Sequence, residues 1–373
     1  TGDYLLKGDV PGVSSVGGEW VILGLGRSDR ISEAFKTGYY ENVVYTLRTI
    51  GSEKLHRAKS TENSRVIIAL TALGYDVTNV DGKNLLAPLA DMDYILKQGI
   101  NGPIWALIAF DTADYEIPAV GGNGTQATRE SLIQTILSAQ QKDGGWDLGD
   151  GVVDVDTTAM AIQALAPYYK ENQDVRTAVN QALTVLSDLQ NADGGFTAFG
   201  SASSESCAQV IVALTSLGMN PNTDARFIKN GKSVLDALAA YYVSGGGFRH
   251  TLNGEVDAMA TEQGYYALVS YYRLIENKTS LYDMLDVEQT ENPVIDRKPV
   301  QEPDQQENPG DSGEQEEPEK DIEGEPDKTD IGGEKTETVP KTGDQNDMAF
   351  YMLLLLLSVT GLTIVQRRKE TVK

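Results

Sequence analysis

The sequence has very little of the chemistry that forms cross-links or binds transition metals. It contains one cysteine, Cys207, and two histidines, His56 and His250, in 373 residues. A single cysteine excludes an intrachain disulfide, and two histidines exclude a metal site built from three or more imidazoles. Cys207 stands in the apolar run CAQVIVAL, which is typical of a small buried side chain. We therefore expect no zinc site.

Positive charge is also scarce. The chain has 31 Lys and Arg against 55 Asp and Glu, a net charge of −24, which excludes the basic footprint of a nucleic-acid-binding protein. Residues 286–342 alone hold 19 acidic and 6 basic residues, and seven prolines fall at 293–340. Such a segment cannot bury enough apolar surface to offset its ordering entropy. We predict a globular region at 1–284 and a disordered, acidic, proline-rich spacer at 285–338.

Three signals follow one another at the C-terminus. An apolar run at 348–365 precedes a basic tail at 366–373 that begins QRRK. Eighteen mostly apolar residues are long enough to span a bilayer, and the basic cluster would stay on the cytoplasmic side. The motif VPKTG stands before this run and consists of Val339, Pro340, Lys341, Thr342 and Gly343.

Together the motif, the span and the tail resemble the sortase sorting signal of Gram-positive cell-wall proteins. The family motif is Leu-Pro-x-Thr-Gly, and Val339 takes the place of the leucine. The resemblance implies that sortase is a partner and that it cuts between Thr342 and Gly343. It further implies a secreted protein joined to peptidoglycan through Thr342, whose precursor is held by a transmembrane helix at 348–365. The alternative is a plain single-pass membrane anchor.

The globular region contains internal repeats. A glycine turn that ends in an aromatic residue recurs at Trp146, Phe196 and Phe248, with spacings of 50 and 52 residues. Apolar runs that hold an Ala-Leu or Gly-Leu pair begin that pair at residues 24, 69, 106, 164, 213 and 267. These runs are apolar on nearly all sides, which is typical of buried helices, and amphipathic helices alternate with them. The pattern predicts an all-α (α/α)6 toroid, with the buried helices as the inner ring.

The Gln-x-x-x-Gly-x-aromatic turns at Gln140–Trp146 and Gln190–Phe196 resemble the repeat of the terpenoid cyclase and protein prenyltransferase superfamily, which includes the squalene cyclase branch. The resemblance covers about residues 1–280 and implies the same toroid. It also implies that the glutamine and the aromatic residue of each turn brace helix ends rather than bind a ligand.

Aligning the six runs places polar and aromatic residues where the inner helices should begin. Helix N-termini carry partial positive charge and free N–H groups, and in a ring they would converge on one mouth. A largely apolar pocket with a few convergent polar groups is the default binding site. The candidate ligand-binding residues are Trp20, Glu62, Arg65, Asn101, Trp105, Asp154, Asp156, Thr157, Glu205, Gln209, Glu262, Gln263 and Tyr265. Plainer roles are a helix cap for Asp156 and a buried structural ion pair for Arg65 with Glu262.

Two enzymatic branches of the superfamily imply different chemistry. Cyclases use Asp-x-Asp-Asp, whose middle aspartate is a general acid, and DVDTTA keeps Asp154 and Asp156 but has Thr157 as its third member. Asp156 is thus the candidate catalytic acid. The aromatic side chains that could stabilise a carbocation are Trp20, Trp105, Trp146 and Tyr265.

Prenyltransferases instead hold zinc with Asp-x-Cys and a later histidine. In this sequence Glu205–Cys207 is one residue out of step with that motif, and Ala260 stands where the histidine should be. This departure agrees with the scarcity of histidine in arguing against zinc.

The segment DVDTTAMAIQAL also resembles the helical domain of transcobalamin and intrinsic factor. That resemblance implies a corrinoid ligand held by Asp156, Thr157 and Gln209 and stacked on Trp20, Trp105 and Tyr265. A carbohydrate-active (α/α)6 enzyme, with Asp156 and either Glu262 or Glu205 as its acid and base, is another alternative. The sequence favours a ligand-binding toroid, with an enzyme as the alternative, and does not identify the ligand.

Overall fold

The computed structural model describes residues 1–13 and 18–296. The VPKTG motif, the apolar run at 348–365, the basic tail and most of the acidic spacer lie outside the described residues. Within the described ranges, no helix combines the length and the apolar character needed to cross a bilayer. The compact unit extends from Thr1 to Val300.

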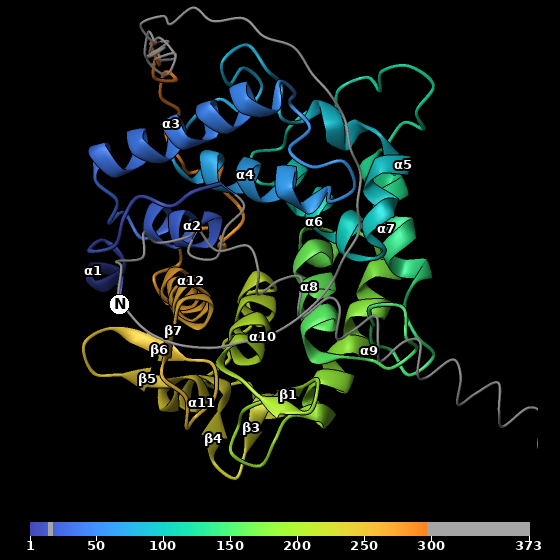
Figure 1. The fold of residues 1–373 in the computed structure, drawn as a ribbon. Coiled ribbons are helices and arrows are strands. Elements are labelled where there is room, and N and C mark those ends of the chain that lie inside the picture. The colour runs from blue at the N-terminus through green and yellow to red at the C-terminus, as the bar shows by residue number, and fades with distance from the viewer. Residues whose placement is uncertain (14–17, 297–373) are drawn as a thin grey trace, which may run out of the picture. The chain divides into compact units, whose positions relative to one another are not determined.

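Six helices pack against one another in chain order and close into a ring, which Figure 1 shows end-on. Each contacts the next, and the last also contacts the first, so this ring has no free edge. These inner helices are α2 (Glu19–Arg27), α4 (Thr61–Ala72), α6 (Asn101–Asp111), α8 (Val155–Leu165), α10 (Ser204–Ser216) and α12 (Ala258–Ile275). They contain the six apolar runs of the sequence and are buried along most of their length.

Amphipathic helices lie outside the ring and alternate with the inner ones along the chain (Figure 1). Helices α7, α9 and α11 pack on α6, α8 and α10 respectively. This alternation of inner and outer helices is the arrangement expected of the toroid. The outer elements are α1 (Gly2–Leu5), α3 (Glu33–Ile50), α5 (Met92–Ile95), α7 (Arg129–Ser138), α9 (Gln173–Leu189), α11 (Val234–Ala240) and the 3-10 turns η1 (Ala87–Ala90), η2 (Leu96–Gln98), η3 (Ala166–Tyr168) and η4 (Ala225–Phe227).

Small antiparallel sheets precede three helices. The prediction of an all-α fold is therefore wrong in this detail. They are β1 (Thr197–Ala198) with β2 (Ser201–Ala202), β3 (Ile228–Lys229) with β4 (Lys232–Ser233), and β5 (Tyr242–Val243) with β6 (Gly247–Arg249) and β7 (Val256–Asp257). In the largest sheet, Phe248 pairs with Tyr242 on one side and with Asp257 on the other. These hairpins form because turn residues such as Gly245 and Gly246 adopt positive φ and reverse the chain tightly.

The recurring glycine turns brace helix ends. The Gln140 amide donates to the carbonyls of Gly144 and Ala178, each at 2.8 Å, and Gln190 repeats this with Gly194 and Phe227. Trp146 is fully buried, and its indole N–H donates to the Ile136 carbonyl at 2.7 Å. Trp146 is therefore a packing residue of the turn and does not belong with aromatic side chains available to a carbocation.

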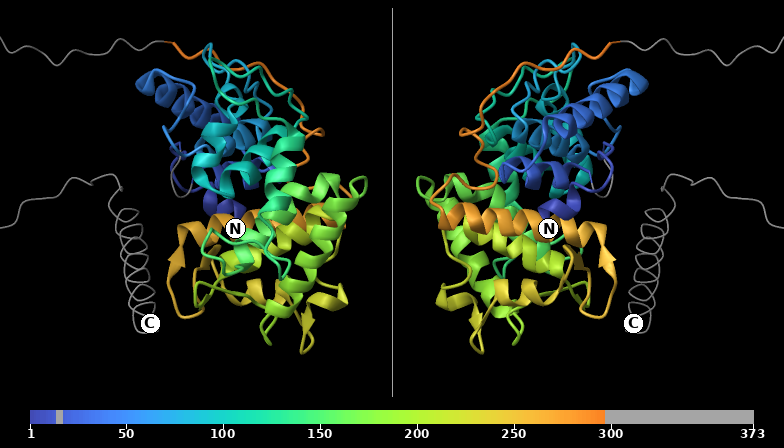
Figure 2. Two further views of the ribbon diagram at one scale, coloured as in Figure 1. Left: turned by 90° about the vertical axis from the view of Figure 1, so that its right-hand side faces the viewer. Right: turned by 90° about the vertical axis from the view of Figure 1, so that its left-hand side faces the viewer.

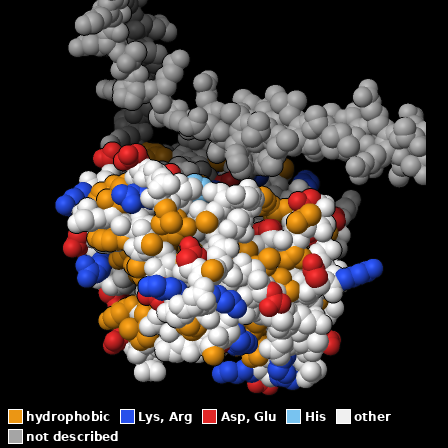
Figure 3. Space-filling view, turned by 90° about the horizontal axis from the view of Figure 1, so that it is seen from below, with side chains coloured by type: hydrophobic (Ala, Val, Ile, Leu, Met, Phe, Trp, Pro, Cys, Tyr) orange, Lys and Arg blue, Asp and Glu red, His pale blue; other side chains and the backbone are white. Residues whose placement is uncertain are grey.

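The outer surface seen from below in Figure 3 has a mixed composition of side chains. Hydrophobic side chains lie there in small groups between acidic and basic ones, and no single kind of side chain dominates. Scattered apolar groups of this sort need no functional explanation.

A C-terminal strap, residues 277–296, crosses the end of the ring opposite to the β5–β7 hairpins (Figure 2). Arg27 and Arg273, both buried, each pair with the Asp286 carboxylate, at 2.7 and 2.5 Å. The Arg27 guanidinium also donates to the carbonyls of Leu281, Ser280 and Asp283. Residues 285–296, which were predicted to belong to the spacer, therefore lie against the ring, because buried arginines hold this part of the acidic segment.

Later residues of the strap are held to other elements of the ring. The amide N–H groups of Met284 and Thr290 donate to the carbonyls of Thr112 and Gly74, both at 2.8 Å. Leu281 and Met284 are buried in the core. The strap is thus part of the folded unit, anchored at the ends of α2, α4, α6 and α12.

We predict that Asp286→Asn loosens the strap. Burial alone would raise the pKa of Asp286, but hydrogen bonds and charge from Arg27 and Arg273 outweigh it and hold the pKa at about 2. A carboxylate whose pKa is depressed in the folded state stabilises the fold at pH values above its unfolded-state pKa. This stabilisation is lost as the pH falls toward 2. At pH 7 the variant should lose about 1–2 kcal/mol of unfolding free energy, reduced for the screening of a carboxylate that is 37% exposed.

Urea denaturation at pH 7 and pH 3 measures this effect, with Glu288→Gln, an exposed acid of the same strap, as the matched control. The parent should lose more stability between the two pH values than Asp286→Asn does. Equal stability of the parent and Asp286→Asn at pH 7 would contradict this role of the arginine pair.

Candidate functional site

The inner helices run in the same direction, so their N-terminal ends share one mouth. Contacts between equivalent levels of neighbouring helices show this. The Gln209 amide of α10 donates to Gln263 of α12 at 3.1 Å, and the hydroxyls of Thr215 and Ser270 lie 2.6 Å apart nearer the C-terminal ends. The expected convergence of the polar helix starts on one side of the ring is therefore present.

Helix α8 begins with a cap that differs from the expected one. Asp154, not Asp156, is the N-cap residue, and its carboxylate accepts the backbone N–H of Thr157 at 2.9 Å. Asp156 lies in the first turn, where its side chain does not cap the helix. The two aspartates thus have separate roles, and Asp156 is left available for contacts inside the mouth.

Asp156 lies in a cluster of ionisable groups formed by α8, α10 and the turn before α12. Its pKa is raised to about 7, chiefly by burial; a hydrogen bond from Ser206 lowers it, Asp154 and Glu205 raise it further, and His250 lowers it. The imidazole Nδ1 of His250 lies 2.9 Å from one Glu205 oxygen and 3.0 Å from the other. A carboxylic acid whose pKa is near neutrality can donate or accept a proton at physiological pH.

His250 was not among the residues expected at this mouth. It follows strand β6, and the backbone carbonyl of His250 accepts the N–H of Ser204 at 3.1 Å, which ties the turn to the start of α10. Its side chain is about half exposed, while that of Glu205 is 12% exposed. The helix-start alignment could not find His250, because it considered only residues leading directly into the apolar runs.

Several acceptor oxygens at the starts of α6 and α8 are buried without a hydrogen-bond partner among the described residues. They are Asn101 Oδ1, Asp154 Oδ2, Asp156 Oδ1 and Thr157 Oγ1. The Thr157 hydroxyl lies near enough to lower the pKa of Asp154 but makes no hydrogen bond of good geometry. An unsatisfied buried polar atom is costly, and such atoms in native proteins call for an explanation.

Aromatic side chains meet within the ring. The rings of Trp20 and Trp105 lie 4.9 Å apart between centroids, and Trp20 lies 6.0 Å from Tyr266. Tyr265, the tyrosine expected here, instead bonds Ser28 through its hydroxyl at 2.8 Å and packs against Gly24. The reason is the helical period: one residue along α12 turns the side chain from the lumen to the seam with α2.

Arg65 lies on the opposite side of the mouth and is neutralised by acids. Its guanidinium is 2.5 Å from Glu62 and 3.9 Å from the buried Glu19, which also accepts the Tyr39 hydroxyl at 3.3 Å. Glu262 is 2% exposed and contributes to the raised pKa of Tyr266. Ion pairs between its own residues hold this half of the mouth together. We therefore assign Glu62 and Arg65 a structural role rather than a ligand-binding one.

A chain of amides crosses the middle of the ring. Gln163 Nε2 donates to both the backbone carbonyl and the side-chain oxygen of Gln209, at 3.0 and 2.9 Å. Gln209 Nε2 donates in turn to Gln263 and to the hydroxyl of Tyr266, at 3.1 and 2.7 Å. Gln209 and Gln263 are thus already engaged by protein groups, and any ligand contact with them would have to share these bonds.

Cys207 is a fully buried thiol of α10. Burial raises the pKa of its thiol to about 12, and it packs near the turn at Gly195. A thiol with such a pKa is protonated at neutral pH and is a poor nucleophile. Among the described residues, no three His, Cys, Asp or Glu side chains gather as metal ligands.

We predict that Asp156→Asn is more stable than the parent at alkaline pH. Because the folded pKa of Asp156 is raised to about 7, stability is full below the unfolded value near 4 and is lost as the pH rises to about 7. An amide has no such charge to desolvate. At pH 8 the variant should gain roughly 2–4 kcal/mol of unfolding free energy, and at pH 4 it should match the parent.

Thermal melts from pH 4 to pH 8 measure this gain. Asp174→Asn is the matched control, because Asp174 holds the equivalent first-turn position of α9 but is exposed. Its melting temperature should track that of the parent at every pH. A parent and an Asp156→Asn variant with parallel pH profiles would show that Asp156 is ionised in the folded protein.

Comparison with known proteins identifies no family. No family model matches the chain, and no curated protein matches it. One solved structure that it resembles is Candida albicans protein geranylgeranyltransferase-I complexed with GGPP. The sequence identity is 16%, the match covers 68% of this chain and 83% of that chain, and the TM-score is 0.46. A likeness this distant carries no argument about ligand or reaction, so the ring is described from its own contacts.

Proposed function

We propose that this chain is a wall-anchored surface protein whose ring binds a small ligand at the mouth formed by the helix N-termini. The observation that carries the binding role is the group of unpartnered buried oxygens at the starts of α6 and α8. All of these atoms can accept a hydrogen bond. A ligand that brings N–H or O–H donors would satisfy them, as would ordered water.

The charge of the mouth narrows the class of ligand. Arg65 and His250 are basic side chains of the mouth, and each lies beside a carboxylate. Further acids lie nearby in Asp154 and Asp156, so an anionic ligand would meet like charge. This arrangement disfavours an isoprenoid diphosphate. It favours a neutral or cationic ligand rich in donors, and a corrinoid, whose edge carries amide groups, remains a candidate.

Thr157→Val is the sharpest test of the binding role. The Thr157 hydroxyl is fully buried and makes no hydrogen bond of good geometry, so removing it should cost the fold little beyond its weak effect on Asp154. If a ligand satisfies that hydroxyl, the variant should bind about threefold to tenfold more weakly. Native mass spectrometry of the chain with cyanocobalamin, geranylgeranyl diphosphate and maltotriose measures binding and distinguishes the ligand classes.

The matched control for this test is Tyr282→Phe, which also removes a buried hydroxyl but at the other end of the ring. We expect cyanocobalamin to bind, the diphosphate not to bind, and, of the two variants, only Thr157→Val to weaken the cyanocobalamin complex. Tight binding of the diphosphate, or equal binding by Thr157→Val and the parent, would contradict the proposal.

Acid catalysis by Asp156 is the second candidate function. It is favoured by the pKa of about 7 and by the aromatic rings of Trp20, Trp105 and Tyr266, whose faces could stabilise a cation. Thr157 in place of a third acid weakens this candidate, because neighbouring carboxylates help to keep the middle one protonated. If the parent converts an isoprenoid and Asp156→Asn does not, this result would favour catalysis over binding alone.

Wall anchoring is supported by the order of VPKTG, apolar run and basic tail in the sequence. The strap ends the folded unit just before the acidic spacer, which fits a stalk that holds the ring away from the membrane. We predict that Pro340→Ala moves the protein from the cell-wall fraction to the membrane fraction of a Gram-positive host with sortase.

Lys341→Ala is the matched control for anchoring, because position three of the family motif accepts any residue. It should leave the protein in the wall fraction, released only by peptidoglycan hydrolase. Membrane retention of the parent itself would show that 348–365 serves as a plain anchor instead.

A further inference from the structure

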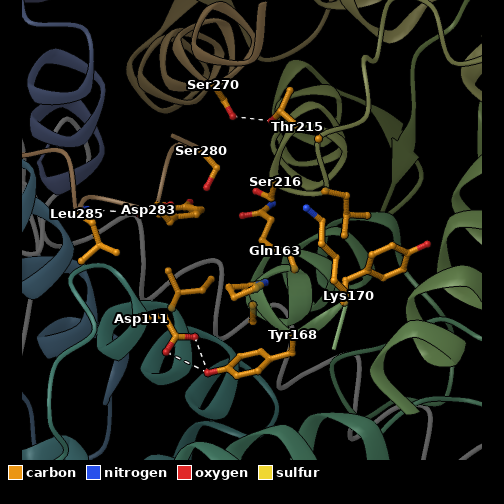
Figure 4. Close-up of a pocket in the computed structure, with 18 of the residues that line it drawn as sticks. Asp111, Gln163, Tyr168, Lys170, Thr215, Ser216, Ser270, Ser280, Asp283 and Leu285 are labelled. Carbon is orange, nitrogen blue, oxygen red and sulfur yellow. Dashed lines mark hydrogen bonds between the residues drawn. The ribbon is translucent and has the colours of Figure 1, made fainter. Parts of the chain in front are cut away.

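The ring has a cavity at the end opposite to the proposed mouth. Its volume is about 620 Å³, within the range of ligand pockets, and it lies among the C-terminal ends of α6, α8, α10 and α12 beneath the strap. Figure 4 shows Gln163 and Ser216 on one side of it, Asp111 with Tyr168 below, and Ser280 with Asp283 of the strap opposite. Lys170 and Leu285, both exposed, mark where it meets solvent.

Three polar atoms of the lining have no hydrogen-bond partner among the described residues: Gln163 Oε1, Ser216 Oγ and Tyr282 OH. Gln163 is 3% exposed and Tyr282 is 8% exposed. The orientation of the Gln163 amide is fixed, because its nitrogen must donate to the Gln209 carbonyl, which leaves its oxygen toward the cavity (Figure 4). The residues around the cavity thus include a buried acceptor, a buried phenol and a buried hydroxyl, which a small movement of their side chains would bring to a ligand.

The electrostatics of this end exclude a charged ligand at the floor. Helix C-termini carry partial negative charge, which disfavours anions. Three cations line the cavity: Lys170 and Lys278 are exposed, and Arg129 is neutralised by Asp111 at 2.7 Å. The same carboxylate accepts the Tyr168 hydroxyl at 2.9 Å. Asp111 is thus engaged twice by protein groups, so it offers little to a cationic ligand.

We propose that this cavity is a second binding site, for a neutral, hydroxyl-rich ligand of the size of a mono- or disaccharide. Sugar hydroxyls donate and accept at once, which matches a lining that needs a donor for Gln163 and an acceptor for Tyr282. The half-buried ring of Tyr168 gives a flat wall for the apolar face of a sugar. This site lies apart from the proposed function's mouth and shares no residue with it, although Gln163 bonds Gln209 and the Tyr282 ring lies 6.2 Å from that of Trp105.

Saturation-transfer-difference NMR on the full 373-residue chain tests the proposal, in a detergent without a sugar head group. The probes are glucose, N-acetylglucosamine and maltose, with glucuronic acid and glucosamine as charged counterparts. At least one neutral sugar should bind, and its charged counterparts should bind more weakly. Ser216→Ala and Tyr282→Phe should each weaken binding about threefold to tenfold, and the double variant should weaken it further.

Both substitutions remove atoms that bond nothing in the described structure, so the variants should melt at or above the parent's temperature. Thr157→Val, at the other mouth, should leave sugar binding unchanged. No binding of any neutral sugar would overturn the proposal, as would equal binding by the parent and the double variant. Sugar binding weakened by Thr157→Val alone would also overturn it and would assign the sugar to the N-terminal mouth.

Discussion

Closure of the ring between its first and last helices is the constraint on which the rest of the structure depends. Helix α2 meets α12 at Gly24, where a Cβ atom would lie 2.7 Å from the Tyr265 ring. The absence of a side chain there lets the two helices approach, and the Arg273 guanidinium adds a bond to the Arg27 carbonyl at 3.0 Å. If this seam opened, the polar helix starts would lie along an open arc and would not surround a common mouth.

Closure also gives the two ends of the lumen opposite characters. At one end the helix N-termini stabilise acids such as Asp154, whose carboxylate caps α8. At the other end the C-termini favour cations, and there the buried arginines hold the strap through Asp286. The amide chain from Gln163 through Gln209 to Tyr266 lies between these ends and bonds elements of both. The direction of the helices thus favours acids at one end and cations at the other, while ion pairs also hold Arg65 at the mouth and Asp111 at the opposite end.

Much of the ring could be predicted from the sequence, because buried helices repeat the same apolar pattern at a regular spacing. The details that failed depend on the phase of single turns or on distant contacts. Asp154 rather than Asp156 caps α8, and Tyr266 rather than Tyr265 faces Trp20, each a difference of one or two residues on a helix. The strap and the cavity beneath it were missed because an acidic, proline-containing segment gives no local sign of the arginines that bind it.

Burial of Asp156 at the mouth costs folding free energy, and it also gives the mouth a carboxylic acid that can exchange a proton near neutral pH. Burying Asp156 beside Glu205 opposes ionisation, so the folded state must either keep a proton there or bear an uncompensated charge. The ring around it supplies enough buried apolar surface, from α2 to α12, to tolerate that cost. A cap alone would not require it, because Asp154 already satisfies the helix end. Asp156 is buried although it does not cap a helix. Its burial therefore supports the proposal of a ligand or a proton transfer at this mouth.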